Sequence, residues 1–203
     1  ALGRFLLVNL IIAPFRSPKS AKLYKEIWSE KGSPLMHYTV LQTEGVRRML
    51  GPDYQVEFAM RYQSPSLESV LERFRTPVFR KIKVVPLFPQ YASATTGSVH
   101  EKVMDIVSRW ETVPEIEFIN SFCDDPAMIE IFAQHGRTLQ PENFDHIVFS
   151  FHGLPERQLR KADCTGGCLQ ENCCDRPVEQ NAFCYRAQCV RTARAIAAAL
   201  NLS

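Results

Sequence analysis

Six of the seven cysteines lie within 26 residues in the last quarter of this 203-residue chain. Thiolates select zinc or iron–sulfur centres, so this density of sulfur predicts a metal or cluster site. An odd count in a tight group fits a disulfide framework poorly, and the paired CxxC spacing of a zinc ribbon is absent. Free or disulfide-paired surface cysteines are the competing interpretation. The six are Cys164, Cys168, Cys173, Cys174, Cys184 and Cys189, and Cys123 stands apart from them.

Four cysteine sulfurs could hold a 2Fe-2S cluster, and Gly166-Gly167 would let the chain wrap closely around it. Cys189 differs from the others because it falls at an inward-facing position of a predicted helix. It is equally well explained as a core residue.

His152 is the histidine with a chemically useful position. It directly follows the apolar run Phe149-Ser150-Phe151 and precedes Gly153, which relaxes the backbone beside it. A neutral imidazole there could bind a metal ion or accept a proton near neutral pH. A histidine that only caps a buried strand is an equally good interpretation from position alone.

Two further polar groups could bind an anionic ligand. The loop Gln90 to Ser98 is rich in hydroxyls that could bind phosphate, carboxylate or a polar rim, but it lacks the nucleotide P-loop pattern. An ordinary Ser/Thr-rich turn is the alternative.

Arg61 and Tyr62 pair a fixed cation with an aromatic ring, which suits a flat anion. A surface salt bridge beside a partly buried tyrosine is the alternative there.

Short apolar runs alternate with amphipathic stretches, as in α/β proteins, and this order predicts parallel strands with right-handed crossovers. In such sheets the chemistry lies beyond the carboxyl ends of the strands, where these polar residues fall. One helix has Pro18 suited to its first turn. The predicted strands are 5–10, 55–61, 81–88, 115–119 and 146–151, and the predicted helices are 17–30, 38–50, 66–75, 98–109, 126–136 and 185–200.

Composition excludes several classes of protein. Hydrophobic residues make up 45% and charged residues 23% of the chain, which argues against disorder. A net charge of +2 is too balanced for a nucleic-acid-binding protein, so no nucleic-acid partner is predicted. No apolar run approaches the length of about 20 residues that a membrane span needs. The clustered cysteines without a secretory signal predict a reducing compartment, the cytoplasm.

Several stretches together resemble the ferrochelatase family, in the family's order and across nearly the whole chain. No single stretch decides the resemblance. They are Leu6-Leu7-Val8-Asn9-Leu10, Arg16-Ser17-Pro18, Gly32-Ser33-Pro34-Leu35, Arg61-Tyr62 with Ser64-Pro65-Ser66-Leu67-Glu68, Pro86 to Ser98, and Phe149-Ser150-Phe151-His152-Gly153-Leu154-Pro155.

The resemblance implies a lyase that inserts Fe²⁺ into a porphyrin, protoporphyrin IX or coproporphyrin III, in haem biosynthesis. It implies two Rossmann-like lobes of parallel sheet and flanking helices with the macrocycle between them. His152 takes the place of the family's metal-site histidine, which accepts a proton or delivers the metal. The residues implied to contact the porphyrin are Arg61, Tyr62, Tyr91, Ser93, Thr95 and Thr96.

Some members carry a 2Fe-2S cluster on an internal cysteine-rich insertion, and residues 164–184 interrupt the chain at that place. The resemblance also implies a first lobe over residues 1–119 and the start of a second over 120–203. The family has an additional segment after Leu10 and a further stretch beyond Ser203 with a catalytic glutamate. We therefore expect the second lobe to be incomplete and residues 1–203 alone to be inactive. The four predicted cluster ligands come from Cys164, Cys168, Cys173, Cys174 and Cys184.

Other functions are consistent with the same residues. One is a porphyrin- or metal-binding fragment without turnover. Another is a related cobalt chelatase, although small cobalt chelatases typically have His-rich metal sites and this chain has one well-placed histidine. A homodimer is a further expectation.

Overall fold

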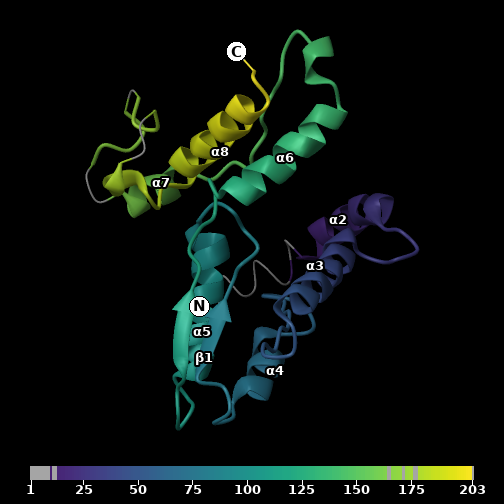
Figure 1. The fold of residues 1–203 in the computed structure, drawn as a ribbon, viewed down its shortest axis with the longest axis vertical. Coiled ribbons are helices and arrows are strands. Elements are labelled where there is room, and N and C mark those ends of the chain that lie inside the picture. Colours follow the sequence, from purple (N-terminus) through teal and green to yellow (C-terminus); the bar gives the residue numbers. More distant parts are fainter. Residues whose placement is uncertain (1–9, 11–12, 164–165, 171, 176–177, 203) are drawn as a thin grey trace. The chain divides into compact units, whose positions relative to one another are not determined.

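The computed structural model describes Leu10 and residues 13–163, 166–170, 172–175 and 178–202. The chain forms two compact units, residues 1–66 and 67–203, and each is described by itself (Figure 1). The predicted lobe boundary at residue 119 lies within the second unit and stays a prediction.

The first unit contains two long helices. Helix α2 spans Ala13–Ile27 and helix α3 spans Pro34–Leu50, which confirms the two helices predicted there. Helix α3 has a proline in its first turn and ends at Gly51, whose φ of 74° favours glycine. Because α2 begins earlier than predicted, Pro18 lies inside that helix and not in its first turn.

The predicted strand 55–61 is wrong. Among the described residues of this unit, the backbone pairing near it is a single bridge between Met60 and Ser66. A strand needs a neighbour along its length, whereas the Val56 carbonyl accepts from the Arg47 guanidinium at 2.5 and 3.2 Å. The predicted strand 5–10 lies outside the described residues except for Leu10.

The second unit contains a two-stranded parallel sheet, which confirms two predicted strands and their direction. Strand β1 spans Lys81–Val84 and strand β2 spans Glu115–Phe118, with Lys81 opposite Glu115. Both strands are shorter than predicted. Their charged residues alternate with apolar ones, so one face of the sheet carries lysine and glutamate and the other faces a core.

The charged face forms a ladder of ion pairs. The Lys81 ammonium lies 2.8 Å from Glu117 and 2.9 Å from Glu115, and Lys83 lies 2.9 Å from Glu117. These contacts raise the pKa of Lys81, chiefly through its bond to Glu117, and lower the pKa of Glu117.

The apolar face packs against helix α5, Ser98–Val107, and helix α4, Leu67–Leu71, which continues into the 3₁₀ turn η2, Glu72–Phe74. The predicted helix 66–75 is therefore divided in two. Val103 is fully buried at the centre of this core. The buried members of the core are Leu71, Ile82, Val103, Ile106, Val107 and Trp110.

Helices α6, Pro126–Thr138, and α8, Tyr185–Ala199, lie side by side in the same unit (Figure 1). Both were predicted. The Asp125 carboxylate caps α6 by accepting from the amides of Ala127 and Met128 at 3.0 and 3.1 Å. A 3₁₀ turn, η4, follows α6 at Pro141–Asn143.

The predicted strand 146–151 is also wrong. Residues 146–155 have no regular secondary structure, and Val148 is 84% exposed. The apolar run has the composition of a strand, but no strand lies alongside it in the described part of the chain. Helix α7, Glu156–Ala162, and the 3₁₀ turn η5, Glu179–Asn181, complete the fold. The architecture is α/β, with a smaller sheet than predicted. Within the described residues, no helix is long and apolar enough to cross a membrane.

Candidate functional site

The loop after β1 carries four of the predicted porphyrin contacts. It turns into a short π-helix, η3, at Ser93–Gly97, which runs directly into α5. Ser93 is exposed and Thr95 is half-buried, and the Thr95 hydroxyl donates to the Ala92 carbonyl at 3.3 Å. Thr96 is fully buried, and its hydroxyl has no hydrogen-bond partner among the described residues. An accessible surface of this loop therefore includes Ser93 and Thr95 but not Thr96.

Tyr91 is held in this loop by contacts on both of its sides. Its ring meets the Phe183 ring edge-on, with centroids 5.5 Å apart. Its hydroxyl lies so close to Gly97 that a Cβ there would approach it to 3.0 Å. Glycine at position 97 therefore makes room for the phenol.

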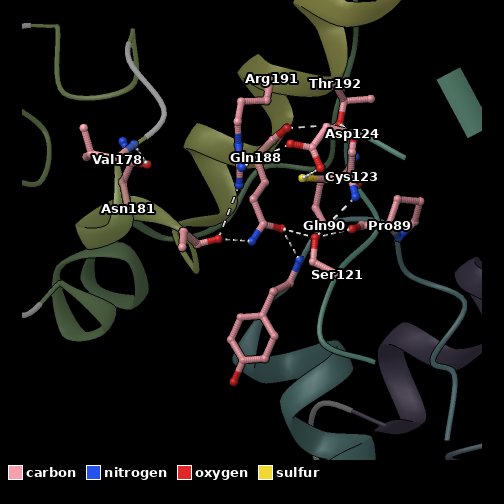
Figure 2. A network of polar contacts seen from close by, with 12 residues as sticks. Pro89, Gln90, Ser121, Cys123, Asp124, Val178, Asn181, Gln188, Arg191 and Thr192 are labelled. Atoms are coloured by element: carbon pink, nitrogen blue, oxygen red, sulfur yellow. Dashed lines mark hydrogen bonds and ion pairs between the residues drawn. The ribbon is translucent and has the colours of Figure 1, made fainter. Parts of the chain in front are cut away.

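The backbone of the loop is fixed by a buried glutamine that the sequence analysis did not identify. Gln188 projects from α8 and is fully buried (Figure 2). Its Oε1 accepts from the Tyr91 amide at 2.6 Å and from the Ser121 hydroxyl at 3.0 Å. Its Nε2 donates to the Ala182 carbonyl at 2.5 Å. One side chain thus connects the loop after β1, the loop after β2 and the chain leading into α8.

Thr192 adds a second connection one helical turn further along α8. Its hydroxyl accepts from Gln90 Nε2 at 2.9 Å and lies 2.5 Å from the Cys123 carbonyl (Figure 2). In the sequence, the four-residue spacing of Gln188 and Thr192 on the apolar face with Ile196 could have revealed them. Polar residues at core positions of a helix imply buried partners.

His152 lies in the irregular segment between η4 and α7, and its side chain is exposed. The expected strand that would project it into a cleft is not formed. The accessible imidazole is compatible with binding a metal ion or accepting a proton, and its role stays a prediction.

Arg61 and Tyr62 belong to the first unit. The guanidinium carbon lies 4.6 Å from the centroid of the Tyr62 ring, which is a cation–π contact. Tyr62 is 79% exposed, so the alternative of a partly buried tyrosine does not hold. The stacked pair presents a positive charge and a flat ring together, as the predicted contact with a planar anion requires.

The cysteine-rich segment is residues 163–184, between α7 and α8. Its described residues form turns and the short helix η5. Cys164 lies outside the described residues. The Cys168 amide donates to the Asp163 carboxylate at 2.8 Å, and Asn181 Nδ2 donates to the Cys173 carbonyl at 3.2 Å. These bonds hold the turns within the described part of the segment.

The thiols of this segment influence one another. Burial, aided by a contact with Cys173 and the charge of Cys184, raises the pKa of Cys174 to about 12. Burial and the charges of Cys184 and Cys173 also raise the pKa of Cys168. The sulfurs of Cys173 and Cys174 lie 3.6 Å apart.

The separation of 3.6 Å is close to what one metal ion requires. Two thiolates bound tetrahedrally at about 2.3 Å lie about 3.7 Å from each other. Among the described residues, however, no group of three cysteine, histidine or acidic side chains lies close enough to hold a metal ion. The donor chemistry fits an iron–sulfur cluster, while the thiols that the structure describes do not by themselves form its ligand set.

Cys189 and Cys123 are outside this group. Both are buried, with exposed fractions of 7% and 2%. Burial raises the pKa of the Cys189 thiol to about 11. The interpretation of Cys189 as a core residue of α8 is consistent with this placement.

Comparison with known proteins identifies the family of the chain. The ferrochelatase family model matches residues 3–203. This chain belongs to the ferrochelatase family. It is 38% identical over 201 residues to a ferrochelatase of Legionella pneumophila (strain Corby), covering 99% of this chain and 59% of that protein. It is 39% identical over 208 residues to a ferrochelatase of Coxiella burnetii (strain Dugway 5J108-111), covering 100% of this chain and 57% of that protein. The chain thus spans somewhat more than half the length of these relatives.

Proposed function

We propose that the protein to which this chain belongs inserts Fe²⁺ into a porphyrin in haem synthesis. The observation that carries the proposal is the match of the ferrochelatase family model over residues 3–203. The exposed His152, the stacked Arg61–Tyr62 pair and the hydroxyls after β1 add residue types suited to a planar anionic substrate and a metal ion.

Metal insertion has physical demands that these residues can meet. A porphyrin must lose two pyrrole protons as it accepts a divalent ion. The imidazole of His152 can accept a proton or transfer the metal, because its neutral form has a free lone pair. The Arg61 guanidinium can pair with a propionate carboxylate through charge-assisted hydrogen bonds. Tyr91 and Ser93 can donate hydrogen bonds along the rim, and Thr95, whose proton is donated to the Ala92 carbonyl, can accept one. The burial of Thr96 suits it to supporting the loop.

A substitution of His152 tests the proposal in the full-length protein. We expect His152→Ala to abolish Fe²⁺ insertion, followed by absorbance, and to leave porphyrin binding intact, followed by fluorescence. His135→Ala is the matched control, since His135 is an exposed residue of α6. Unchanged insertion in the His152 variant would remove that residue from its role. Binding without insertion by the wild type would favour a carrier, and a preference for Co²⁺ and a corrinoid precursor would favour a cobalt chelatase.

We propose that residues 1–203 alone form little or no haem or zinc porphyrin. The support is the coverage of only 57–59% of the relatives' length. Absorbance measurements on the purified 1–203 piece, beside the full-length protein, would show this. Substantial product formation by the piece would contradict the expectation.

We further propose that the cysteine-rich segment holds a 2Fe-2S cluster through four of Cys164, Cys168, Cys173, Cys174 and Cys184. A bound cluster would supply a redox-active iron–sulfur centre. The mutual influence of the described thiols and the bond that the Cys168 amide donates to the Asp163 carboxylate support this assignment. The clustered thiols also favour a reducing compartment, the cytoplasm, as the location. A homodimer stays a prediction.

Colour tests the cluster directly. Full-length protein purified without oxygen should be red-brown, and Cys168→Ser should lose that absorbance. Cys189→Ala is the matched control and should keep the colour, because Cys189 is a buried residue of α8. A colourless protein with stoichiometric zinc would contradict the proposal.

A further inference from the structure

We propose that Gln188 is a positioning residue that couples the conformation of the cysteine-rich segment to that of the loop after β1. The expected effect on porphyrin binding rests on the proposed function, since that loop is the predicted porphyrin contact. The coupling itself is a property of the hydrogen-bond network in Figure 2.

The first step is the position of Gln188 between the two regions. Its Oε1 holds the Tyr91 amide at 2.6 Å, and its Nε2 holds the Ala182 carbonyl at 2.5 Å. Tyr91 begins the hydroxyl-rich loop, and Ala182 lies two residues before Cys184. A single planar amide therefore spans from one region to the other.

The second step is that the amide cannot exchange these partners for water. Gln188 is fully buried, so a broken bond on either side leaves an unpaired polar group in the interior. The Ser121 hydroxyl lies 3.0 Å from Oε1 and 2.8 Å from the Pro89 carbonyl, and its single proton is shared between these two acceptors. A shift of the Ala182 carbonyl therefore pulls the amide as long as their bond holds, and the amide in turn pulls Tyr91. Loss of that bond uncouples the two regions.

The third step is that hydrogen bonds connect the cysteine-rich segment to Ala182. The Asn181 side chain donates to the Cys173 carbonyl at 3.2 Å and accepts from the Val178 amide at 3.1 Å. The Ala182 amide bonds to the Glu179 carbonyl at 3.1 Å. Movement near Cys173 thus reaches Ala182 through Asn181 and the η5 turn.

The test uses two substitutions with different losses. Gln188→Met removes the bonds to both Tyr91 and Ala182, whereas Gln188→Glu keeps an acceptor for Tyr91 and, when ionised, has no donor for Ala182. Hydrogen exchange on the full-length protein should show the Tyr91 amide exchanging about 5–30-fold faster in Gln188→Met, and near the wild-type rate in Gln188→Glu. Exchange of Val103 in the core should stay unchanged in both. Gln134→Met, at an exposed position of α6, is the matched control.

A double-mutant cycle tests the coupling. Asn181→Ala should speed Tyr91 exchange in the wild-type background and add nothing in Gln188→Met. Additive effects, or a Tyr91 amide unaffected by Gln188→Met, would overturn the inference. Uniformly faster exchange across the core would also overturn it, because that outcome describes a general loss of stability.

The link to substrate is measured separately. Gln188→Met should raise the KM for porphyrin about 5–30-fold with a smaller change in kcat, and Gln188→Glu should restore much of it. Changed exchange with an unchanged KM would overturn the substrate part of the inference. A wild-type protein that binds no porphyrin would instead overturn the proposed function, while the exchange results would still decide the coupling.

Discussion

The layer of β1, β2 and α5 and the cysteine-rich segment of residues 163–184 are held in shape by different forces. The layer buries a continuous apolar cluster that includes Val103 and Trp110. The described part of the segment consists of turns held by polar contacts, such as the pair of Asp175 and Arg194 at 2.7 Å. Apolar burial is strong and needs no ligand, whereas exposed polar contacts contribute little each. The predicted substrate loop therefore begins at a strand that is fixed by apolar packing. The predicted cluster ligands lie instead in turns with little apolar burial, where a bound metal would add most to the stability.

The largest effect should come from the core of the layer. Trp110 is 7% exposed, so Trp110→Ala should lower the free energy of unfolding by about 3–5 kcal/mol, through lost burial and the cavity left behind. Urea unfolding of the full-length protein measures this. Trp28→Ala is the matched control, since Trp28 is 55% exposed, and it should cost under about 1 kcal/mol. Equal losses in the two variants would contradict the assignment of Trp110 to the core.

The next largest effect should be a loss of stability at high pH. It tests whether Cys189 on α8 is buried, as the core residues of the layer are. Burial raises the pKa of its thiol from 9.0 to about 11. Because the pKa is higher in the folded than in the unfolded protein, the buried neutral thiol contributes fully to the folding stability below pH 9. That contribution is lost as the pH rises through 11. The loss should reach about 2–3 kcal/mol. Unfolding measured from pH 7 to 11 should show a steeper decline in the wild type than in Cys189→Ala. Parallel curves would contradict the burial of this thiol.

A smaller effect is expected where the layer meets α8. Thr192→Val keeps the shape of the side chain but removes the acceptor of Gln90 Nε2 and the donor to Cys123. It should lower the free energy of unfolding by about 1–2 kcal/mol, because buried polar groups lose their partners. Thr138→Val, at an exposed position of α6, should change it much less. A neutral Thr192→Val would mean that water satisfies these groups.

The smallest effect should come from the segment itself. Arg194→Gln breaks the ion pair with Asp175, and the side chains of both residues are about half exposed. The substitution should lower the free energy of unfolding by about 0.2–1 kcal/mol. Limited proteolysis within residues 163–184 should nevertheless become faster. Arg109→Gln, which breaks the exposed pair with Asp105, is the control and should not affect that proteolysis. A loss as large as that of Trp110→Ala would remove the distinction between the two regions.

Much of the fold could be predicted from local patterns, because helices and the central strands carry their own periodicity. Helices α3, α6 and α8 and strands β1 and β2 all lie where the sequence indicated them. The runs 55–61 and 146–151 have the composition of strands but do not form them. β-propensity describes a residue's fit to a pleated surface, and it cannot supply the neighbouring strand that the backbone needs.

The candidate site residues show the same division between what the sequence predicts and what only the structure shows. Residue types and their order were sufficient to select His152, the Arg61–Tyr62 pair, the loop after β1 and the cysteines, since these groups are recognisable wherever the chain places them. That Thr96 is buried, that Cys173 and Cys174 have sulfurs 3.6 Å apart, and that Gln188 joins Tyr91 to Ala182 was decided only by the tertiary structure. Burial and hydrogen-bond partners depend on residues up to 102 positions apart, and no local pattern encodes contacts over such a separation.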